Sequence, residues 1–367
     1  MFKNIVFWLE FPLFHMSPFI KSVSEVIDAN VIVVCEKQIP QWRLDMGFVQ
    51  PDFGDSNVYV QPTRDIRNTL VKKYSSKETV HVFHGLRGVK ENYKCFKSLA
   101  GKQCSVGLYF EPSVLHGSFK AILRKFLYRF LFFRIDKNVD FMLALGDLGR
   151  NQYIGLGLNK DKVYSFPYFI DDDKIISKRL FDNKRLVKLL FVGQLIPRKN
   201  VLLLIQAVNN VVGLGIKIQL DIVGDGILKD DLKRTVSSLG LDNIVFFLGS
   251  KNQAELQDIF LNHDAFILPS KFDGWGCVAV EAMASGLPII VSDSCGSASV
   301  VSEKEHGFVV ESNSLSSLTS KIEFLVDNIY FYNNEKTVSS RLDYVRKNLS
   351  ASSGAAMLAD VFNKIGK

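Results

Sequence analysis

Two carboxylates eight positions apart, Asp273 and Glu281, stand on either side of a glycine-containing turn. A short apolar run precedes the turn and predicts a buried strand, and good helix formers follow it. The turn itself contains Gly274, Trp275 and Gly276. Because the first N–H groups of a helix have no partner within the helix, such a turn binds anions, phosphates above all. We therefore expect a bound anion here, with both acids beside it.

Two cations stand at the start of another predicted helix. The strand expected over residues 186–192 is closed by Gly193, and Arg198 and Lys199 follow in the loop. Charge-assisted bonds to an anion such as phosphate are worth about 1.5–3 kcal/mol each, more than a solvated surface lysine gains. We therefore expect Lys199 and Arg198 to be candidates for binding an anion.

Histidine and acid side chains also follow predicted strands in the first half of the chain. His84 ends the strand over residues 80–83, at the edge where α/β sheets bind ligands, while His81 is expected to pack. The alternative for His84 is a hydrogen bond within its own loop. His15, Arg87 and Glu111 lie in comparable loops and are weaker candidates for binding an acceptor.

These residues need two sheets to position them. Strand and helix patterns alternate from the amino terminus onward and start again near residue 186, which predicts two doubly wound α/β domains. The polar segment over residues 171–185 is the expected boundary. We expect no signal peptide, because Met1-Phe2-Lys3 leads directly into a strand pattern.

Composition limits the class of protein. The chain has 367 residues, five scattered cysteines without metal-ligand spacing, and no apolar run of transmembrane length. These features favour a reducing, cytosolic setting. The net charge is +7, and residues 1–172 hold most of it, with 23 Lys or Arg against 17 Asp or Glu. A basic half favours an anionic partner, and the absence of an aromatic and basic platform argues against nucleic acid.

The segment Phe119–Ile135 combines five cations with a wide apolar surface. This pattern is typical of a helix that lies on a membrane, and anionic lipid would be its partner. The alternative is a core helix with a solvated basic edge, and the sequence does not separate the two.

The stretch 269–288 resembles the donor-site signature of retaining family 4 glycosyltransferases of the GT-B fold. That signature has two acids separated by seven residues and ends in E-A-M-A-x-G-x-P. Asp273 stands where the family usually has Glu, and Gln194 replaces the family's Arg directly after the glycine. The resemblance is specific over residues 186–311 and loose over residues 1–170.

The resemblance implies two Rossmann-like domains that face each other across a central cleft. An acceptor-binding domain would span residues 1–172, a linker 173–185 and a nucleotide-sugar-binding domain 186–340. A helix over 341–367 would return to the first domain.

The resemblance also implies roles for individual residues. Glu281 would accept hydrogen bonds from ribose hydroxyls, Asp273 would bind sugar hydroxyls, and His84 would lie near the reacting sugar. The remaining donor-site residues would hold the diphosphate and the base: Gly193, Arg198, Lys199, Gly274, Trp275 and Gly276 for the diphosphate, and Ser250 and Lys251 for the base.

The implied activity is transfer of a sugar from a nucleotide-diphosphate sugar, with UDP favoured, to a glycan or lipid-diphosphate-linked acceptor with retention of configuration. We expect no cofactor and no metal. The setting would be surface polysaccharide assembly, O-antigen or capsule, by a cytoplasmic protein on the inner face of the membrane. The alternatives are a sugar-nucleotide epimerase of the same fold and an inactive membrane scaffold.

Overall fold

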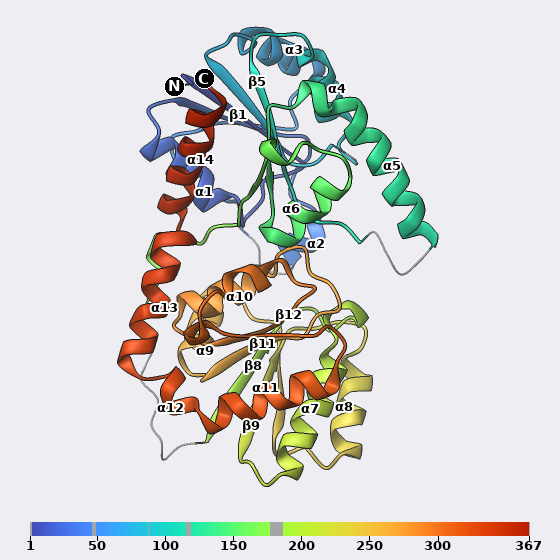
Figure 1. Cartoon of the computed structure of the whole chain (residues 1–367), viewed down its shortest axis with the longest axis vertical. Helices are drawn as coiled ribbons and strands as arrows, with labels where there is room; N and C mark the ends of the chain where they lie inside the picture. Colours follow the sequence, from blue (N-terminus) through green and yellow to red (C-terminus); the bar gives the residue numbers. More distant parts are fainter. Residues whose placement is uncertain (1, 46–48, 87, 115–118, 177–185, 367) are drawn as a thin grey trace. The chain divides into compact units, whose positions relative to one another are not determined.

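The structure is a computed structural model that describes residues 2–45, 49–86, 88–114, 119–176 and 186–366. The chain divides into two compact units (Figure 1). The first unit comprises Met1–Asp171 and Leu349–Lys367, and the second comprises Asp172–Asn348.

A parallel sheet of seven strands forms the centre of the first unit, in the order β3-β2-β1-β4-β5-β6-β7. Its strands are β1 (Asn4–Leu9), β2 (Asn30–Cys35), β3 (Asn57–Val60), β4 (Thr79–Phe83), β5 (Ser105–Phe110), β6 (Phe141–Ala144) and β7 (Val163–Ser165). Its helices are α1 (Ser17–Val26), α2 (Gln41–Asp45), α3 (Arg64–Lys73), α4 (Lys90–Leu99), α5 (Phe119–Ile135), α6 (Gly146–Gly155) and α14 (Ala351–Ile365).

The second unit has a parallel sheet of six strands in the order β10-β9-β8-β11-β12-β13. Its strands are β8 (Val187–Val192), β9 (Ile218–Val223), β10 (Val245–Gly249), β11 (Ala265–Leu268), β12 (Ile289–Ser292) and β13 (Gly307–Val310). Its helices are α7 (Val201–Gly213), α8 (Lys229–Ser238), α9 (Gln253–Leu261), α10 (Cys277–Ala284), α11 (Leu315–Asp327), α12 (Ile329–Tyr332) and α13 (Glu335–Asn348).

Each sheet reverses its strand order at one point, between β1 and β4 in the first unit and between β8 and β11 in the second. Ligands of open α/β sheets bind outside the carboxyl ends of the strands at such points. His84 directly follows β4, and the loops that carry Lys199 and Asp273 follow β8 and β11. The topology thus places predicted residues of both units where each sheet can bind a ligand.

The core of the first unit contains one of its histidines. The Trp8 indole is fully buried, lies flat on the Phe83 ring at 5.5 Å, and donates to Nδ1 of His81 at 3.0 Å. Nε2 of His81 must then carry the ring proton, and it donates to the Tyr74 carbonyl at 2.6 Å. His81 therefore packs, as its position in the strand predicted.

The carboxyl-terminal region is two helices rather than the single one expected from about residue 341. α13 ends before Leu349, and Ser350 caps α14 by accepting from the Ser353 amide. The break lies against Ile170, which donates to the Leu349 carbonyl at 2.9 Å and accepts from the Ala351 amide at 2.8 Å. α14 then lies beside α1 in the first unit (Figure 1). Of the expected linker, residues 177–185 lie outside the described ranges.

Candidate active site

The loop between β11 and α10 is shaped by close backbone contacts. Gly276 has φ of +83°, and a Cβ there would lie 2.8 Å from the Leu268 side chain. A Cβ on Gly296 would lie 2.3 Å from the Gly274 carbonyl oxygen. Side chains at these positions would force the loops apart, so glycine is required for the turn to reach the start of α10.

The same turn presents hydrogen-bond donors that lack acceptors. Within the described ranges, nothing accepts from the backbone N–H groups of Gly274, Trp275 and Gly276. The Trp275 indole Nε1 and the Ser297 hydroxyl are also buried without a partner there. Buried donors are rarely left unsatisfied in proteins, and at the start of a helix they suit an anion. The turn therefore presents donors of the kind that the predicted anion site requires.

Lys199 reaches this turn from the neighbouring loop. Its Nζ lies 2.5 Å from Oδ2 of Asp273, and both side chains are mostly buried, at 11% and 13% exposed. Arg198 is more exposed; its Nη1 lies 3.5 Å from the same oxygen and donates to the Phe272 carbonyl at 2.9 Å. The two predicted diphosphate ligands and the predicted sugar ligand are thus one charge cluster.

Tight loop packing also positions Lys199. After β8, Gly193 lies against the next loop, where a Cβ on Gly224 would be only 2.0 Å from the Gly193 carbonyl oxygen. Asn200 adopts the left-handed conformation, φ +57° and ψ +36°, which ends the short turn before α7. The ammonium is therefore held by an irregular backbone that the loop sequence specifies.

Glu281 lies on α10, eight residues after Asp273. Burial raises the pKa of its carboxyl above the ordinary value, and nearby Lys174 opposes this shift. Among the described residues, none donates a hydrogen bond to this carboxylate. A partly buried acid without donors is costly, and hydroxyl groups of a ligand would supply them.

In the first unit, three side chains from different elements form a chain of hydrogen bonds. Nε2 of His84 lies 2.7 Å from the Tyr168 hydroxyl, which donates to Oε1 of Glu111 at 2.8 Å. Because a phenol has one proton, Nε2 of His84 is the donor in the first bond. His84 also has a hydrogen bond with its own backbone, so its bond to Tyr168 comes in addition to the local bond considered as the alternative. His15 completes the group, its ring centroid 4.2 Å from that of Tyr168.

Both histidines are held neutral. Burial lowers the pKa of His84 to about 4. Burial, then the charge of His84 and that of Arg43, lowers the pKa of His15 to about 3. A pocket of about 210 Å³ borders His84 and Glu111. At pH 7 a neutral imidazole thus faces space for a small group.

Comparison with known proteins agrees with this geometry. Residues 172–337, nearly the whole second unit, match the family model described as glycosyl transferases group 1. Residues 172–337 are therefore similar to this glycosyltransferase family, in the part of the chain where the sequence resemblance is specific. The chain is 32% identical over 142 residues to the *Escherichia coli* UDP-Gal:alpha-D-GlcNAc-diphosphoundecaprenol alpha-1,3-galactosyltransferase, covering 37% of this chain and 35% of that protein.

Other relatives extend the likeness. The capsular polysaccharide glycosyltransferase CapM of *Staphylococcus aureus* is 24% identical over 53% of this chain and 51% of its own. The chain spans about a third of the length of the curated relatives most similar to it.

Solved structures show the fold over the whole chain. Anabaena HepE in complex with UDP has a TM-score of 0.74 at 13% identity, over 99% of this chain and 100% of that one. The lipopolysaccharide outer core galactosyltransferase WaaB has a TM-score of 0.72 at 16% identity, over 98% and 99%. The fold is therefore GT-B, as predicted.

Two predicted base-site residues follow β10. Ser250 is exposed, and Lys251 forms an ion pair with Glu255 at 3.0 Å at the start of α9. Glu255 and Asn252 also form a capping box at that helix start. Lys251 thus has a local structural partner, and its contact with a base stays a prediction.

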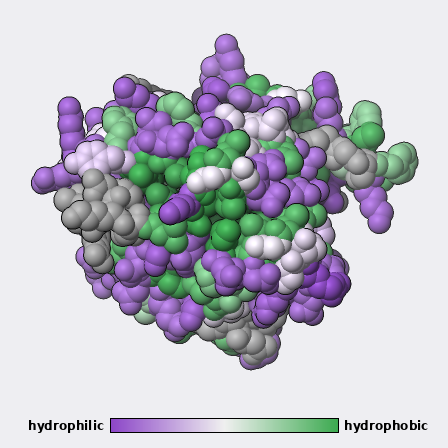
Figure 2. Space-filling model, turned by 90° about the horizontal axis from the view of Figure 1, so that it is seen from below, coloured by the Kyte–Doolittle hydropathy of each residue, from purple (hydrophilic) through white to green (hydrophobic). Residues whose placement is uncertain are grey.

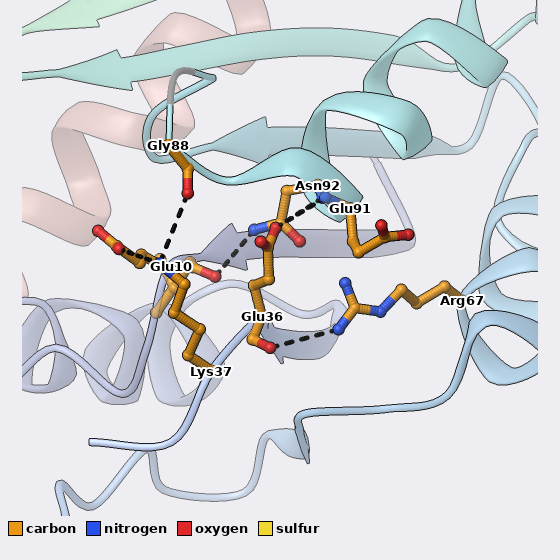
Figure 3. A network of polar contacts seen from close by, with 8 residues as sticks. Glu10, Glu36, Lys37, Arg67, Gly88, Glu91 and Asn92 are labelled. Carbon is orange, nitrogen blue, oxygen red and sulfur yellow. Dashed lines mark hydrogen bonds and ion pairs between the residues drawn. The ribbon is translucent and has the colours of Figure 1, made fainter. Parts of the chain in front are cut away.

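A polar network supports the strand ends of the first unit (Figure 3). Lys37 pairs with Glu10 at 2.7 Å, and Glu10 borders the same pocket as His84. Beside it, the Glu36 carboxylate accepts from the Asn92 amide at 2.9 Å, and Nδ2 of Asn92 donates to the Leu9 carbonyl at 2.8 Å. These bonds hold β1 and β2 to the start of α4, so the pocket wall has a defined position.

The sequence did not reveal every residue of the candidate site. Tyr168, which joins His84 to Glu111, and Glu10 were not predicted, although strand-end position could have suggested Glu10. Ser297 was also missed, because it reaches the α10 turn from another loop. Arg87 lies outside the described residues.

Proposed function

We propose that this chain transfers a sugar from a nucleotide-diphosphate sugar, UDP-linked in the first instance, to a glycan or lipid-linked acceptor. The anomeric configuration is retained and no metal takes part. The observation that carries the proposal is that the Lys199 ammonium lies 2.5 Å from Asp273, the residue directly before the turn. In that turn the N–H groups of residues 274–276 have no acceptor among the described residues. A cation and a helix start stabilise a departing diphosphate electrostatically.

The other residues fit this assignment. Glu281 lacks hydrogen-bond donors and accepts from the ribose diol, and Asp273 accepts from sugar hydroxyls. His84, neutral at pH 7, contacts the sugar or the acceptor hydroxyl in its pocket. HepE was solved with UDP and with UDP and glucose, which supports UDP as the first nucleotide to test.

The acceptor class is proposed from relatives. The *E. coli* galactosyltransferase is named for a diphosphoundecaprenol acceptor, CapM for capsular polysaccharide, and WaaB for the lipopolysaccharide outer core. We place this chain in surface polysaccharide assembly, at the inner face of the cytoplasmic membrane.

α5 supplies the membrane contact in this proposal (Figure 1). It buries Ala121, Phe132 and Ile135, yet Phe119, Phe126, Phe130 and Phe133 are 80%, 67%, 61% and 78% exposed. The spacings of 7, 4 and 3 residues place these four rings on one face of the helix. α5 therefore has a second apolar face that the first unit leaves uncovered. A helix buried in the core with only a solvated basic edge would have no such exposed apolar face.

Charge favours an anionic membrane as the occupant of that face. The helix contains no acid, and its cations are Lys120, Arg124, Lys125, Arg129 and Arg134. Each cation near an anionic surface contributes about 1 kcal/mol. Elsewhere on the surface, the view in Figure 2 also has hydrophobic residues near its centre, with hydrophilic residues around them. We single out α5 because its aromatic stripe and its cations lie on one helix.

The membrane contact is tested by sedimentation with vesicles that contain 30% phosphatidylglycerol. We expect the parent protein to bind at low salt, and a variant with Lys120, Arg124, Lys125 and Arg129 changed to Gln to bind at least tenfold less. The matched control changes Lys72, Lys73, Lys94 and Lys97 on α3 and α4 to Gln. A parent protein that stays in the supernatant at low salt would refute membrane docking.

Transfer is tested with radiolabelled sugar nucleotides, selected by thermal shift, and a diphospholipid-linked sugar acceptor. We expect the label to move to the acceptor, and free nucleotide to appear only when acceptor is present. Turnover should persist in EDTA. Nucleotide release without acceptor, together with a changed sugar, would favour the epimerase.

A further inference from the structure

Lys199 and Asp273 bind each other in the structure. Nζ of Lys199 lies 2.5 Å from Oδ2 of Asp273, and only 11% and 13% of the two side chains is exposed. The proposed function needs the same ammonium for the diphosphate and the same carboxylate for sugar hydroxyls. Each of the two groups would therefore have two partners in the proposed function, the other member of the ion pair and the ligand.

The backbone around Asp273 leaves the side chain as the part that moves. The Asp273 amide donates to the Ser294 carbonyl at 3.0 Å, and its carbonyl accepts from the Gly296 amide at 3.1 Å. The next loop is also tied in, because the Lys271 amide donates to the Arg198 carbonyl at 2.8 Å. Rotation about side-chain bonds separates the ion pair without breaking any of these bonds.

We infer that Asp273 alternates between Lys199 and the donor sugar, and that this exchange makes the site prefer the loaded sugar nucleotide to the spent nucleoside diphosphate. The inference rests on the proposed function. With a loaded donor, phosphate binds Lys199 and sugar hydroxyls bind Asp273, so both charges keep a partner.

With the spent nucleotide the balance differs. Phosphate still binds Lys199, but no sugar hydroxyl remains for Asp273. A mostly buried carboxylate without donors is costly, and Arg198, 42% exposed and 3.5 Å away, is a weaker partner than Lys199. Asp273 therefore competes with the product phosphate for Lys199. The competition promotes product release once the sugar has gone to the acceptor.

The inference makes a prediction of unusual sign. Asp273→Asn removes the competitor, so calorimetric titration with UDP should show affinity about tenfold higher than in the parent, roughly 1.4 kcal/mol. Affinity for the intact sugar nucleotide should stay equal or fall, and product inhibition by UDP should increase. The preference for loaded over spent nucleotide is then lost.

The matched control is Asp343→Asn on α13, which removes the same charge from the same unit at a carboxylate paired with Arg346 at 2.9 Å. We expect it to change UDP affinity less than twofold. If UDP binds the parent but binds Asp273→Asn equally or more weakly, the exchange is wrong while the donor site stands. If no nucleotide binds the parent, the proposed function itself fails.

A measurement on the parent protein covers the case that Asp273→Asn does not fold. In a crystal structure with UDP bound, Lys199 should contact phosphate and should be separated from Asp273 beyond hydrogen-bond distance. An ammonium that keeps both the phosphate and the carboxylate would overturn the exchange.

Discussion

The sites of the two units are built from different materials. In the second unit, the site is the turn over residues 274–276, which we call the backbone cradle. Backbone N–H groups and closely packed glycines form it, and among the described residues its buried donors have no acceptors. In the first unit, side chains that already satisfy one another form the site, His84 to Tyr168 to Glu111. A backbone cradle suits a group that never changes, the diphosphate. Substitution can change which ligand a side-chain site binds without moving the main chain. Such a site therefore suits an acceptor that varies from one protein to another.

The largest effect should come from the charge in the backbone cradle. Lys199→Ala removes the cation that stabilises the leaving diphosphate, and we expect kcat/KM to fall about 100-fold, in the range found for loss of one electrostatic stabiliser. Glu281→Gln should cost at least tenfold. Steady-state kinetics and UDP titration check both variants, with Lys229→Ala on α8 as the matched lysine control. Parent-like kinetics in folded Lys199→Ala would remove it from the site.

Protonation of buried histidines should lower the free energy of unfolding of the first unit as the pH falls. Burial lowers the pKa of His15 to about 3 and those of His81 and His84 to about 4, below their ordinary value of 6.5. Between pH 6.5 and 4 the unfolded chain binds more protons than the folded one, so stability falls as the pH falls through this window.

We expect the fully buried His81 to contribute about 2 kcal/mol to that loss. Urea unfolding at pH 7 and pH 4.5 measures it, and His81→Gln should flatten the dependence. An equal pH dependence in parent and variant would show that His81 does not titrate as its burial requires.

Tyr168→Phe tests the comparison of the two sites, because it breaks the hydrogen bonds from His84 to Tyr168 and from Tyr168 to Glu111 and leaves the backbone cradle of the second unit unchanged. We expect kcat to fall about fivefold while UDP affinity stays unchanged, since one hydrogen bond of about 1 kcal/mol is lost. The acid limb of the kcat profile should also move, because His84 loses the acceptor for its Nε2 proton. Tyr109→Phe, which loses a bond to the Pro167 carbonyl instead, is the matched control. A change in UDP affinity would contradict the proposal that the second unit alone binds the nucleotide and that the His84 site contributes only to turnover.

The smallest effect should come from Lys251→Ala. Its ammonium already pairs with Glu255 near the surface, and exposed pairs contribute about 0–1 kcal/mol. UDP affinity should change less than about threefold, as titration will show. A tenfold loss would establish Lys251 as a base-binding residue.

The sequence predicted those parts of the sites whose residues lie close together in the chain, and it missed contacts between residues far apart in the chain. Asp273, Gly274, Gly276 and Glu281 lie within one turn and one helix. The local sequence pattern was therefore enough to predict a turn at the start of a helix with an acid on each side. Tyr168 lies 84 positions after His84, and only the order of strands in the sheet brings them together.

α5 shows a second limit. One apolar face packs on its own unit and another does not, and helical periodicity cannot tell a covered face from an uncovered one. The break between α13 and α14 was missed for a related reason, since Ser350 ends one helix and caps the next through contacts with the distant Ile170.

The backbone bonds between Ile170 and the segment at Leu349 have a consequence for biosynthesis. In the order of the chain, the second unit is an insertion into the first, and the first-unit segments on its two sides are hydrogen-bonded to each other. All of its residues leave the ribosome before α14, which the first unit needs to cover Phe2, Phe141 and Phe169. The first unit begins first in the chain but is completed last, so the second unit can fold before the final helix of the first unit has been made.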